Sequence, residues 1–284
     1  MTPRPQLRTP DAAGSTTSAV TVAAPAPASA PPPAECELPN GRLIHCLSPA
    51  EAMVLWNEAT GDGLYRAASE ELQPGDTVLD VGANIGVTSL MFGWRVPGLR
   101  IIALEPAPRT YGCLEANLQR YLPDAVAVPA AVCESAGERK FTFYPRASGN
   151  SGLFADREAD DRLTEAFLRN SGIPEEYIGE MVRGLHRGEE LTVPAVTVSD
   201  LIRRHGLAEI SLLKVDVERA EHLVLAGVEE QHWPLVRRVV AEVHDEHGRL
   251  AEISALLQRH GFRTVAKQQP VLAGTGLYEL DAHR

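Results

Sequence analysis

The stretch Thr77-Val78-Leu79-Asp80-Val81-Gly82-Ala83-Asn84-Ile85-Gly86 decides the fold of this chain. A short apolar run ends in an acid, a glycine-bearing turn follows, and residues 87–94 are able to form a helix. Strand, tight turn and helix in this order build the nucleotide-binding crevice of an α/β sheet. Glycine permits a left-handed turn, and the start of the helix presents free N–H groups to an anion. The sequence therefore predicts a nucleotide-like ligand at this turn.

The glycine spacing separates two kinds of nucleotide ligand. The dinucleotide fingerprint G-x-G-x-x-G requires glycine at positions 82 and 84, and glycine or alanine at 87. This chain has Gly82, Asn84 and Val87 instead. Hydride transfer is therefore disfavoured, and D-x-G-A-N-x-G resembles the first motif of methyltransferases that use S-adenosylmethionine (SAM).

Residues 1–34 differ in composition from the rest of the chain. They are rich in Ala, Pro, Ser and Thr and contain almost no large apolar side chain. Such a segment buries too little surface to offset its ordering entropy, so we expect it to be disordered. Residues 35–284 suit a single α/β domain with an insertion. The apolar run at 19–24 is too short for a signal peptide, and no run approaches the ~20 apolar residues of a membrane span.

Charge and cysteine content exclude several functions. A net charge of −11 argues against a nucleic-acid partner, because a phosphate backbone requires clustered Lys and Arg. The four cysteines, at 36, 46, 113 and 133, show neither C-x-x-C nor partner-like spacing. We therefore expect reduced thiols in the cytoplasm, and a small-molecule acceptor that is neutral or carried on another molecule.

The rest of the chain alternates between apolar strands and amphipathic helices. Strands are expected at residues 77–81, 100–104, 125–132, 210–215, 236–243, 262–266 and 277–280. Helices between the early strands predict parallel pairing with right-handed crossovers. We expect the last strand to form an antiparallel edge. A hairpin at 38–46 opens the ordered part, and N-caps are expected at Ser48, with Glu51 completing a capping box, and at Ser199.

The alternation breaks over residues 140–198. A strand at 140–144 is followed by a polar loop to residue 153, a charged helix-like segment over 156–190 and a strand at 191–198. Long insertions at the C-terminal edge of strands commonly serve binding. We interpret this insertion as a cap over the substrate; the alternative is a solvated excursion that only stabilises the fold.

Polar residues stand at the carboxyl ends of the predicted parallel strands. They are Asp80, Glu105, Asp216, Glu218, Glu242 and His244. Ligands of an open parallel sheet bind at the carboxyl ends of its strands, and buried carboxylates are costly unless paired. A cationic ligand such as SAM, with its sulfonium, ammonium and ribose diol, would explain the acids. Glu105, 19 residues after Gly86, is placed to bind the ribose, and a helix-capping role is its alternative.

Three motifs together identify a family. The segments 80–86 (DVGANIG), 104–106 (LEP) and 213–221 (LKVDVERAE) resemble the signatures of the FkbM family of SAM-dependent methyltransferases. The resemblance spans residues 38–280 and implies a Rossmann-like class I methyltransferase fold, with a mostly parallel seven-stranded sheet and an inserted helical cap. The segments 241–245 and 143–145 are most similar to the branch that O-methylates macrolide polyketides. Many members have glycine after V-D-V-E, whereas this chain has Arg219, which disfavours sugar acceptors.

The resemblance also implies a cofactor site. The residues expected to bind SAM are Asp80, Gly82, Ala83, Asn84, Gly86, Glu105, Pro106, Ala131 and Asp216. Tyr65 and the loop at 148–151 are further candidates for contact with cofactor or acceptor.

An alcohol acceptor loses its proton as it attacks, and a nearby base accelerates such a reaction about 10²–10⁴-fold. We expect His244 to be this base, because imidazole titrates near neutral pH. Asp216 is the rival base, and Glu242 is placed to orient the imidazole. The alternative for His244 is a core histidine bonded to the backbone. Lys214 is expected to pair with Asp216 or Glu218.

We therefore predict a SAM-dependent O-methyltransferase that acts on a hydroxyl of a secondary metabolite, with a polyketide macrolide as the favoured acceptor. The alternatives are methylation of a sugar hydroxyl and a non-catalytic SAM- or nucleotide-binding module. No bound metal is predicted, although Asp216, Glu218, Glu242 and His244 could instead hold a divalent ion. A monomer or homodimer is expected.

Overall fold

The computed structural model describes residues 33–284. Of the segment predicted to be disordered, residues 1–32 lie outside the described part, and Ala34 belongs to the first strand instead. The ordered chain opens with a hairpin of β1 (Ala34–Glu37) and β2 (Leu43–Cys46), so strand structure begins slightly earlier than expected.

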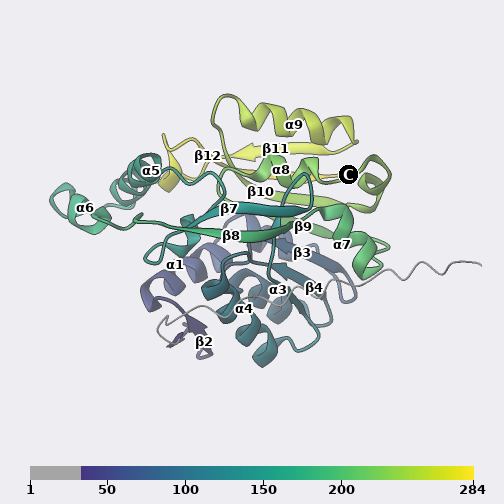
Figure 1. Cartoon of the computed structure of the whole chain (residues 1–284), viewed down its shortest axis with the longest axis horizontal. Coiled ribbons are helices and arrows are strands. Elements are labelled where there is room, and N and C mark those ends of the chain that lie inside the picture. The colour runs from purple at the N-terminus through teal and green to yellow at the C-terminus, as the bar shows by residue number, and fades with distance from the viewer. Residues whose placement is uncertain (1–32) are drawn as a thin grey trace, which may run out of the picture.

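A seven-stranded sheet forms the centre of the domain (Figure 1), with the strand order β11-β12-β10-β9-β3-β4-β5. Its parallel strands are β3 (Thr77–Val81), β4 (Arg100–Leu104), β5 (Val126–Val128), β9 (Leu212–Val215) and β10 (Arg238–His244). The predicted class, a mostly parallel seven-stranded α/β sheet, is confirmed. Because β3 has β4 on one side and β9 on the other, the strand order reverses there, and such a switch point is where α/β sheets bind ligands.

The C-terminal strand corrects one prediction. We expected the last strand at the edge, but β12 (Leu277–His283) lies between β10 and β11 (Arg263–Lys267) and is antiparallel to both. The edge is β11 instead. A long hydrogen-bonded register with β10, from Arg238–His283 to His244–Leu277, places β12 inside the sheet.

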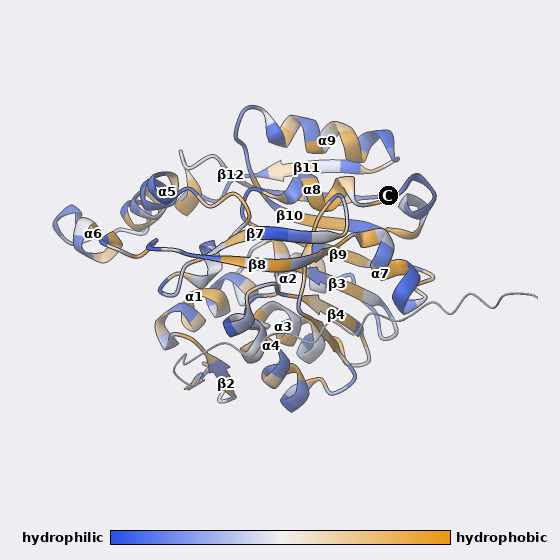
Figure 2. Cartoon of the chain, viewed as in Figure 1, coloured by the Kyte–Doolittle hydropathy of each residue, from blue (hydrophilic) through white to orange (hydrophobic). Residues whose placement is uncertain are grey.

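Helices cover both faces of this sheet. One face carries α1 (Pro49–Thr60), α2 (Leu64–Ser69), α3 (Val87–Arg95) and α4 (Pro108–Tyr121); the other carries α7 (Val198–His205), α8 (Glu221–Ala226) and α9 (Arg249–Arg259). Strand side chains alternate between the two layers, since Val78 packs with α1–α4 and Leu79 with α7–α9. Hydrophobic residues accordingly gather on the strands and on the inward helix faces (Figure 2).

The insertion comprises a second small sheet and two helices. Pro129 interrupts the strand expected at 125–132, so that only β5 joins the large sheet and β6 (Ala131–Val132) pairs with β8 (Glu189–Val196). β7 (Gly137–Phe143) pairs with β8 antiparallel. α5 (Arg157–Asn170) and α6 (Glu175–Val182) project from this sheet (Figure 1). Short 3₁₀ turns occur at Ser148–Asn150, Glu230–Leu235 and Pro270–Leu272.

Helix caps follow the sequence only in part. Ser48 caps α1 by accepting from the Glu51 N–H, but the Glu51 side chain accepts from the Gly149 N–H, 2.9 Å away, instead of completing a capping box. The cap of α7 is Thr197, with Asp200 closing the box, whereas Ser199 accepts from the Glu229 N–H. Within residues 33–284, no helix is long and apolar enough to cross a membrane.

Candidate active site

A cavity of about 730 Å³ lies at the carboxyl ends of β3, β4, β9 and β10. This volume is within the range of small-molecule sites. Its wall includes Glu242 and six of the predicted cofactor residues, namely Gly82, Asn84, Glu105, Pro106, Ala131 and Asp216. Tyr65 and the loop at 148–151 also line it. The cavity therefore brings together most of the residues that the sequence singled out.

The glycine turn packs tightly against the loop after β9. Gly82 has φ +80°, and a Cβ atom there would lie 1.7 Å from the Asp216 carbonyl oxygen. Gly86 has φ +90°, and its Cβ atom would lie 2.8 Å from Leu114 Cδ1. Asn84 also adopts a positive φ of 50°, and its Oδ1 accepts from the Ile85 N–H while its Nδ2 donates to Ser148 Oγ. Position 82 therefore has no room for a side chain, and the left-handed φ at position 86 strains any residue other than glycine.

Asp80 is fully buried behind this turn and is not among the residues that line the cavity. Its carboxylate accepts from Ser89 Oγ at 2.6 Å and pairs with Lys214 Nζ at 3.1 Å. Lys214 also pairs with Asp216 at 3.2 Å, as predicted, and donates to the Gly82 carbonyl at 2.7 Å. Burial lowers the pKa of Lys214, but the carboxylates of Asp216 and Asp80 outweigh it and raise the pKa above its ordinary value. Lys214 therefore stays charged.

Glu105 both caps a helix and faces the cavity. Its Oε1 accepts from the Ala107 N–H and Thr110 Oγ1 at the start of α4, while Oε2 accepts from the Asn84 N–H. Within the chain, Glu105 therefore has the helix-capping role that was its alternative, and it also contacts the glycine turn. Burial raises the pKa of Glu105 to about 7, although these donors oppose the change.

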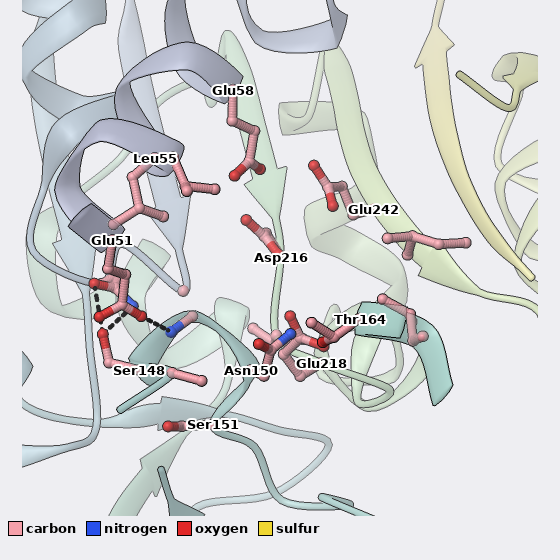
Figure 3. Close-up of a pocket in the computed structure, with 18 of the residues that line it drawn as sticks. Glu51, Leu55, Glu58, Ser148, Asn150, Ser151, Thr164, Asp216, Glu218 and Glu242 are labelled. Carbon is pink, nitrogen blue, oxygen red and sulfur yellow. Dashed lines mark hydrogen bonds between the residues drawn. The ribbon is translucent and has the colours of Figure 1, made fainter. Parts of the chain in front are cut away.

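Three carboxylates converge on one part of the cavity (Figure 3). Glu58, Asp216 and Glu242, hereafter the carboxylate trio, have oxygen atoms within 4.8 Å of one another. The Tyr65 hydroxyl lies 3.1 Å from Asp216 Oδ2 and 3.2 Å from Glu242 Oε1. Although Glu58 as a residue is exposed, enclosure of its carboxylate raises the pKa to about 7, and Asp216 adds to this. Burial and Glu58 raise the pKa of Glu242 well above its ordinary value. The trio therefore requires positive charge, from Lys214, protons or a cationic ligand.

The sequence reasoning did not identify Glu58. It lies on α1, ahead of the first strand of the large sheet, and not at a strand end. The available signal was helical spacing, because Glu51, Leu55 and Glu58 fall on one face of α1 and all three line the cavity.

His244 is not among the cavity-lining residues. Its Nε2 lies 3.1 Å from Glu218 Oε2 and its Nδ1 lies 3.3 Å from Glu221 Oε1, and only 7% of its side chain is exposed. Burial lowers the pKa of His244, but the two carboxylates outweigh it and raise the pKa to about 10. The imidazole is therefore a cation at neutral pH, bonded to side chains and not to the backbone. Neither His244 nor Glu218 belongs to the cluster of converging ligand atoms, so Asp216, Glu218, Glu242 and His244 do not meet at one point.

The insertion supplies the apolar part of the cavity wall. The residues concerned are Leu163, Phe167 and Leu168 of α5, Met181 of α6, and Leu185, with Val271 and Leu272 facing them from the C-terminal region. The cavity thus has an acidic side at the strand ends and an apolar side at the insertion.

Fold and site together define a Rossmann-like α/β domain with a ligand cavity at its topological switch point. The model of the methyltransferase FkbM domain matches residues 80–264. A Streptomyces tacrolimicus protein named 31-O-demethyl-FK506 methyltransferase FkbM is 43% identical over 248 residues, covering 87% of this chain and 95% of the relative. Methyltransferase sdnD of Sordaria araneosa is 36% identical over 232 residues, covering 77% and 85% respectively. This chain belongs to the FkbM family of methyltransferases, as its three motifs predicted.

Solved structures resemble the chain more distantly. The methyltransferase FkbM from Methylobacillus flagellatus KT has a TM-score of 0.49 and 12% sequence identity, covering 80% of this chain and 47% of that chain.

Replacing Gly82 by alanine tests the packing of the turn. Gly82→Ala should lower the free energy of unfolding by at least about 3 kcal/mol, because the clash with the Asp216 carbonyl adds to left-handed strain. Gly75→Ala is the matched control, since Gly75 has φ +93° and open space around it, and should lose only about 1–2 kcal/mol. Urea unfolding measures both values. Equal losses would contradict the close packing.

The histidine pairing predicts a pH-dependent stability. The folded pKa of His244 is raised to about 10, above the ~6.5 of an unfolded histidine, so its contribution is complete below pH ~6.5 and is lost toward pH ~10. His244→Gln should therefore destabilise the protein by about 3 kcal/mol at pH 6 and by much less at pH 10. Thermal unfolding across this range, with the exposed His247→Gln as control, measures the difference. A pH-independent loss would refute the charged pairing.

Proposed function

We propose that the chain is a SAM-dependent O-methyltransferase acting on a hydroxyl of a bulky, largely apolar secondary metabolite, with a macrolide polyketide as the favoured acceptor. One observation carries the proposal: a single cavity joins the glycine turn and the strand-end carboxylates to an apolar wall from the insertion. The name of the Streptomyces relative, which specifies 31-O-demethyl-FK506 as substrate, supports this choice of acceptor.

The residues present suit SAM chemically. Gly82 lines the cavity, and the carboxylates of Glu105 and Asp216 complement a ribose diol and a positive charge. We propose that Asn84, Pro106 and Ala131, which share this wall, contact the same ligand, with Ala83 and Gly86 shaping the turn and Asp80 holding it through Lys214. Bound SAM supplies a methyl group activated by sulfonium.

We propose that the chain contributes alignment and a proton acceptor. Alignment of the acceptor oxygen with the reacting carbon can supply up to roughly 7–11 kcal/mol. The carboxylate trio faces the cavity, so its oxygens are the proposed recipients of the hydroxyl proton, and Glu58, which retains solvent contact, passes it on. His244 already holds both ring protons, so it is not the base. We propose that it positions the Glu218 side chain instead.

The acceptor assignment is tested by incubating the protein with SAM and a panel of hydroxyl compounds. The panel contains 31-O-demethyl-FK506, other demethyl macrolides and simple glycosides. We expect S-adenosylhomocysteine to form and a macrolide to gain the mass of one methyl group. Methylation of glycosides alone would favour the sugar alternative. SAM binding by calorimetry without product from any acceptor would favour the non-catalytic module.

The carboxylate trio predicts the pH dependence of the rate. The pKa of Glu58 is raised to about 7, and its deprotonated form accepts a proton, so kcat/KM should fall as pH decreases below about 7. The positive charge of bound SAM lowers the pKa of the trio, so at saturating SAM the rate should begin to fall only at a lower pH. Glu58→Gln should reduce kcat about 10²-fold and retain SAM binding. Glu70 is a surface carboxylate near Arg66 and Arg95, so the control variant Glu70→Gln should retain the kcat of the wild type.

Two outcomes would contradict this assignment. Full activity in Glu58→Gln would remove Glu58 from the path of the proton. Activity that EDTA abolishes and magnesium restores would assign the carboxylates to a metal ion instead of the proton.

A further inference from the structure

Two consecutive residues after β9 adopt left-handed backbone conformations. Glu218 has φ 52° and Arg219 has φ 69°. Only glycine adopts this region without strain, so an arginine at 219 is retained against its local conformational preference. Strain of this kind persists where the surrounding contacts over-determine the conformation.

Arg219 forms a buried ion pair with the insertion. Its Nη1 lies 2.6 Å from Asp160 Oδ1 of α5, and the side chains are 6% and 1% exposed respectively. Asp160 Oδ2 accepts from the Tyr144 hydroxyl at 2.8 Å. The Arg219 backbone N–H donates to Glu221, and its Nε donates to the half-exposed Glu246. We call Arg219, Asp160 and Tyr144 the clasp.

The clasp joins the two sides of the cavity. Arg219 directly follows the loop that presents Asp216 and Glu218 to the cavity. On α5, Asp160 lies one turn before Thr164 and two turns before Phe167, which belong to the opposite wall. The loop and α5 therefore cannot move independently while the ion pair is intact.

A second contact places the insertion against the same loop. A Cβ atom at Gly152 would lie 3.0 Å from both Glu218 Cβ and the Glu218 carbonyl oxygen. On α5, the next residue after Asp160, Asp161, pairs with the fully buried His186 at 2.7 Å. Asp160 thus holds α5 to the loop after β9, and Asp161 holds α5 to the rest of the insertion, which packs on the same loop at Gly152. These contacts together position the apolar residues of α5 relative to the strand-end acids.

We propose that Arg219 is a positioning and specificity-determining residue: through the clasp it fixes α5 so that the cavity holds a bulky apolar acceptor with its hydroxyl at the carboxylate trio. This inference rests on the proposed function for the acceptor. Loss of the clasp should release α5, weaken binding of bulky acceptors and leave the glycine-turn side of the cavity intact.

The first test follows α5 in the free protein. The double variant Arg219→Gly/Asp160→Asn removes both charges together, so no buried charge is left without a partner. Hydrogen–deuterium exchange should become about tenfold faster in residues 157–170, while the calorimetric Kd for SAM changes less than about twofold. Tyr144→Phe, which removes one donor to Asp160, should shift exchange in the same direction by less. Glu246→Gln, which removes the half-exposed partner, should match the wild type.

The second test measures specificity. The double variant should raise KM for the macrolide that the panel identifies about tenfold and leave KM for a simple glycoside unchanged, with kcat less affected. Unchanged exchange in α5, or an equal loss of kcat with both acceptors at unchanged KM, would overturn the proposal. If the double variant does not fold, the same measurements of exchange in α5 and of KM for both acceptors are made on Tyr144→Phe and test the proposal. If the wild type turns over none of the acceptors, both the proposed function and the specificity role of Arg219 are refuted. Hydrogen–deuterium exchange in residues 157–170 then still tests whether the clasp holds α5.

Discussion

The buried ammonium group of Lys214 is the interaction on which this structure depends. It lies on β9, is 2% exposed, and contacts the Asp80 carboxylate on β3, the Asp216 carboxylate and the Gly82 carbonyl. Without it, the switch point of the sheet would contain unneutralised carboxylates, which are costly in a protein interior. The same cation fixes the glycine turn to the loop after β9. The stability of the central strands and the geometry of the cavity therefore have one origin.

Much of the fold follows from local patterns, and the differences have non-local causes. The strand–turn–helix at 77–95 is specified by its own apolar run and glycines, and the structure contains it as β3 and α3. The position of β12 depends on pairing with β10 and β11, and no local pattern shows whether a final strand joins an edge or enters the sheet. The cap of α7 also depends on a distant residue. Thr197 and Ser199 are both good caps, but Ser199 accepts a hydrogen bond from the Glu229 N–H, and Thr197 caps the helix.

The sequence predicted those site residues whose positions follow from the topology of the sheet. Acids that follow parallel strands must meet at one sheet edge, and Glu105, Asp216 and Glu242 do line one cavity. Glu58 joins them through the packing of α1, which a strand-end argument does not include. His244 illustrates the opposite limit: its residue type indicated a group that titrates near neutral pH, but Glu218 and Glu221 change its pKa through tertiary contact. Proximity to a site was predictable from sequence, whereas charge state required the complete environment.

The place of β12 inside the sheet has a consequence for synthesis on the ribosome. β3, β4 and β5 have all emerged early and can pair while translation continues, since their partners are close in sequence. β10 and β11 are joined only through β12, so both present open edges until residues 277–283 have left the exit tunnel. Leu277 and Glu279 of this strand also line the cavity. A nascent chain that already carries the complete glycine turn therefore still lacks a closed site, and its exposed strand edges make that interval the one in which misassembly competes with folding.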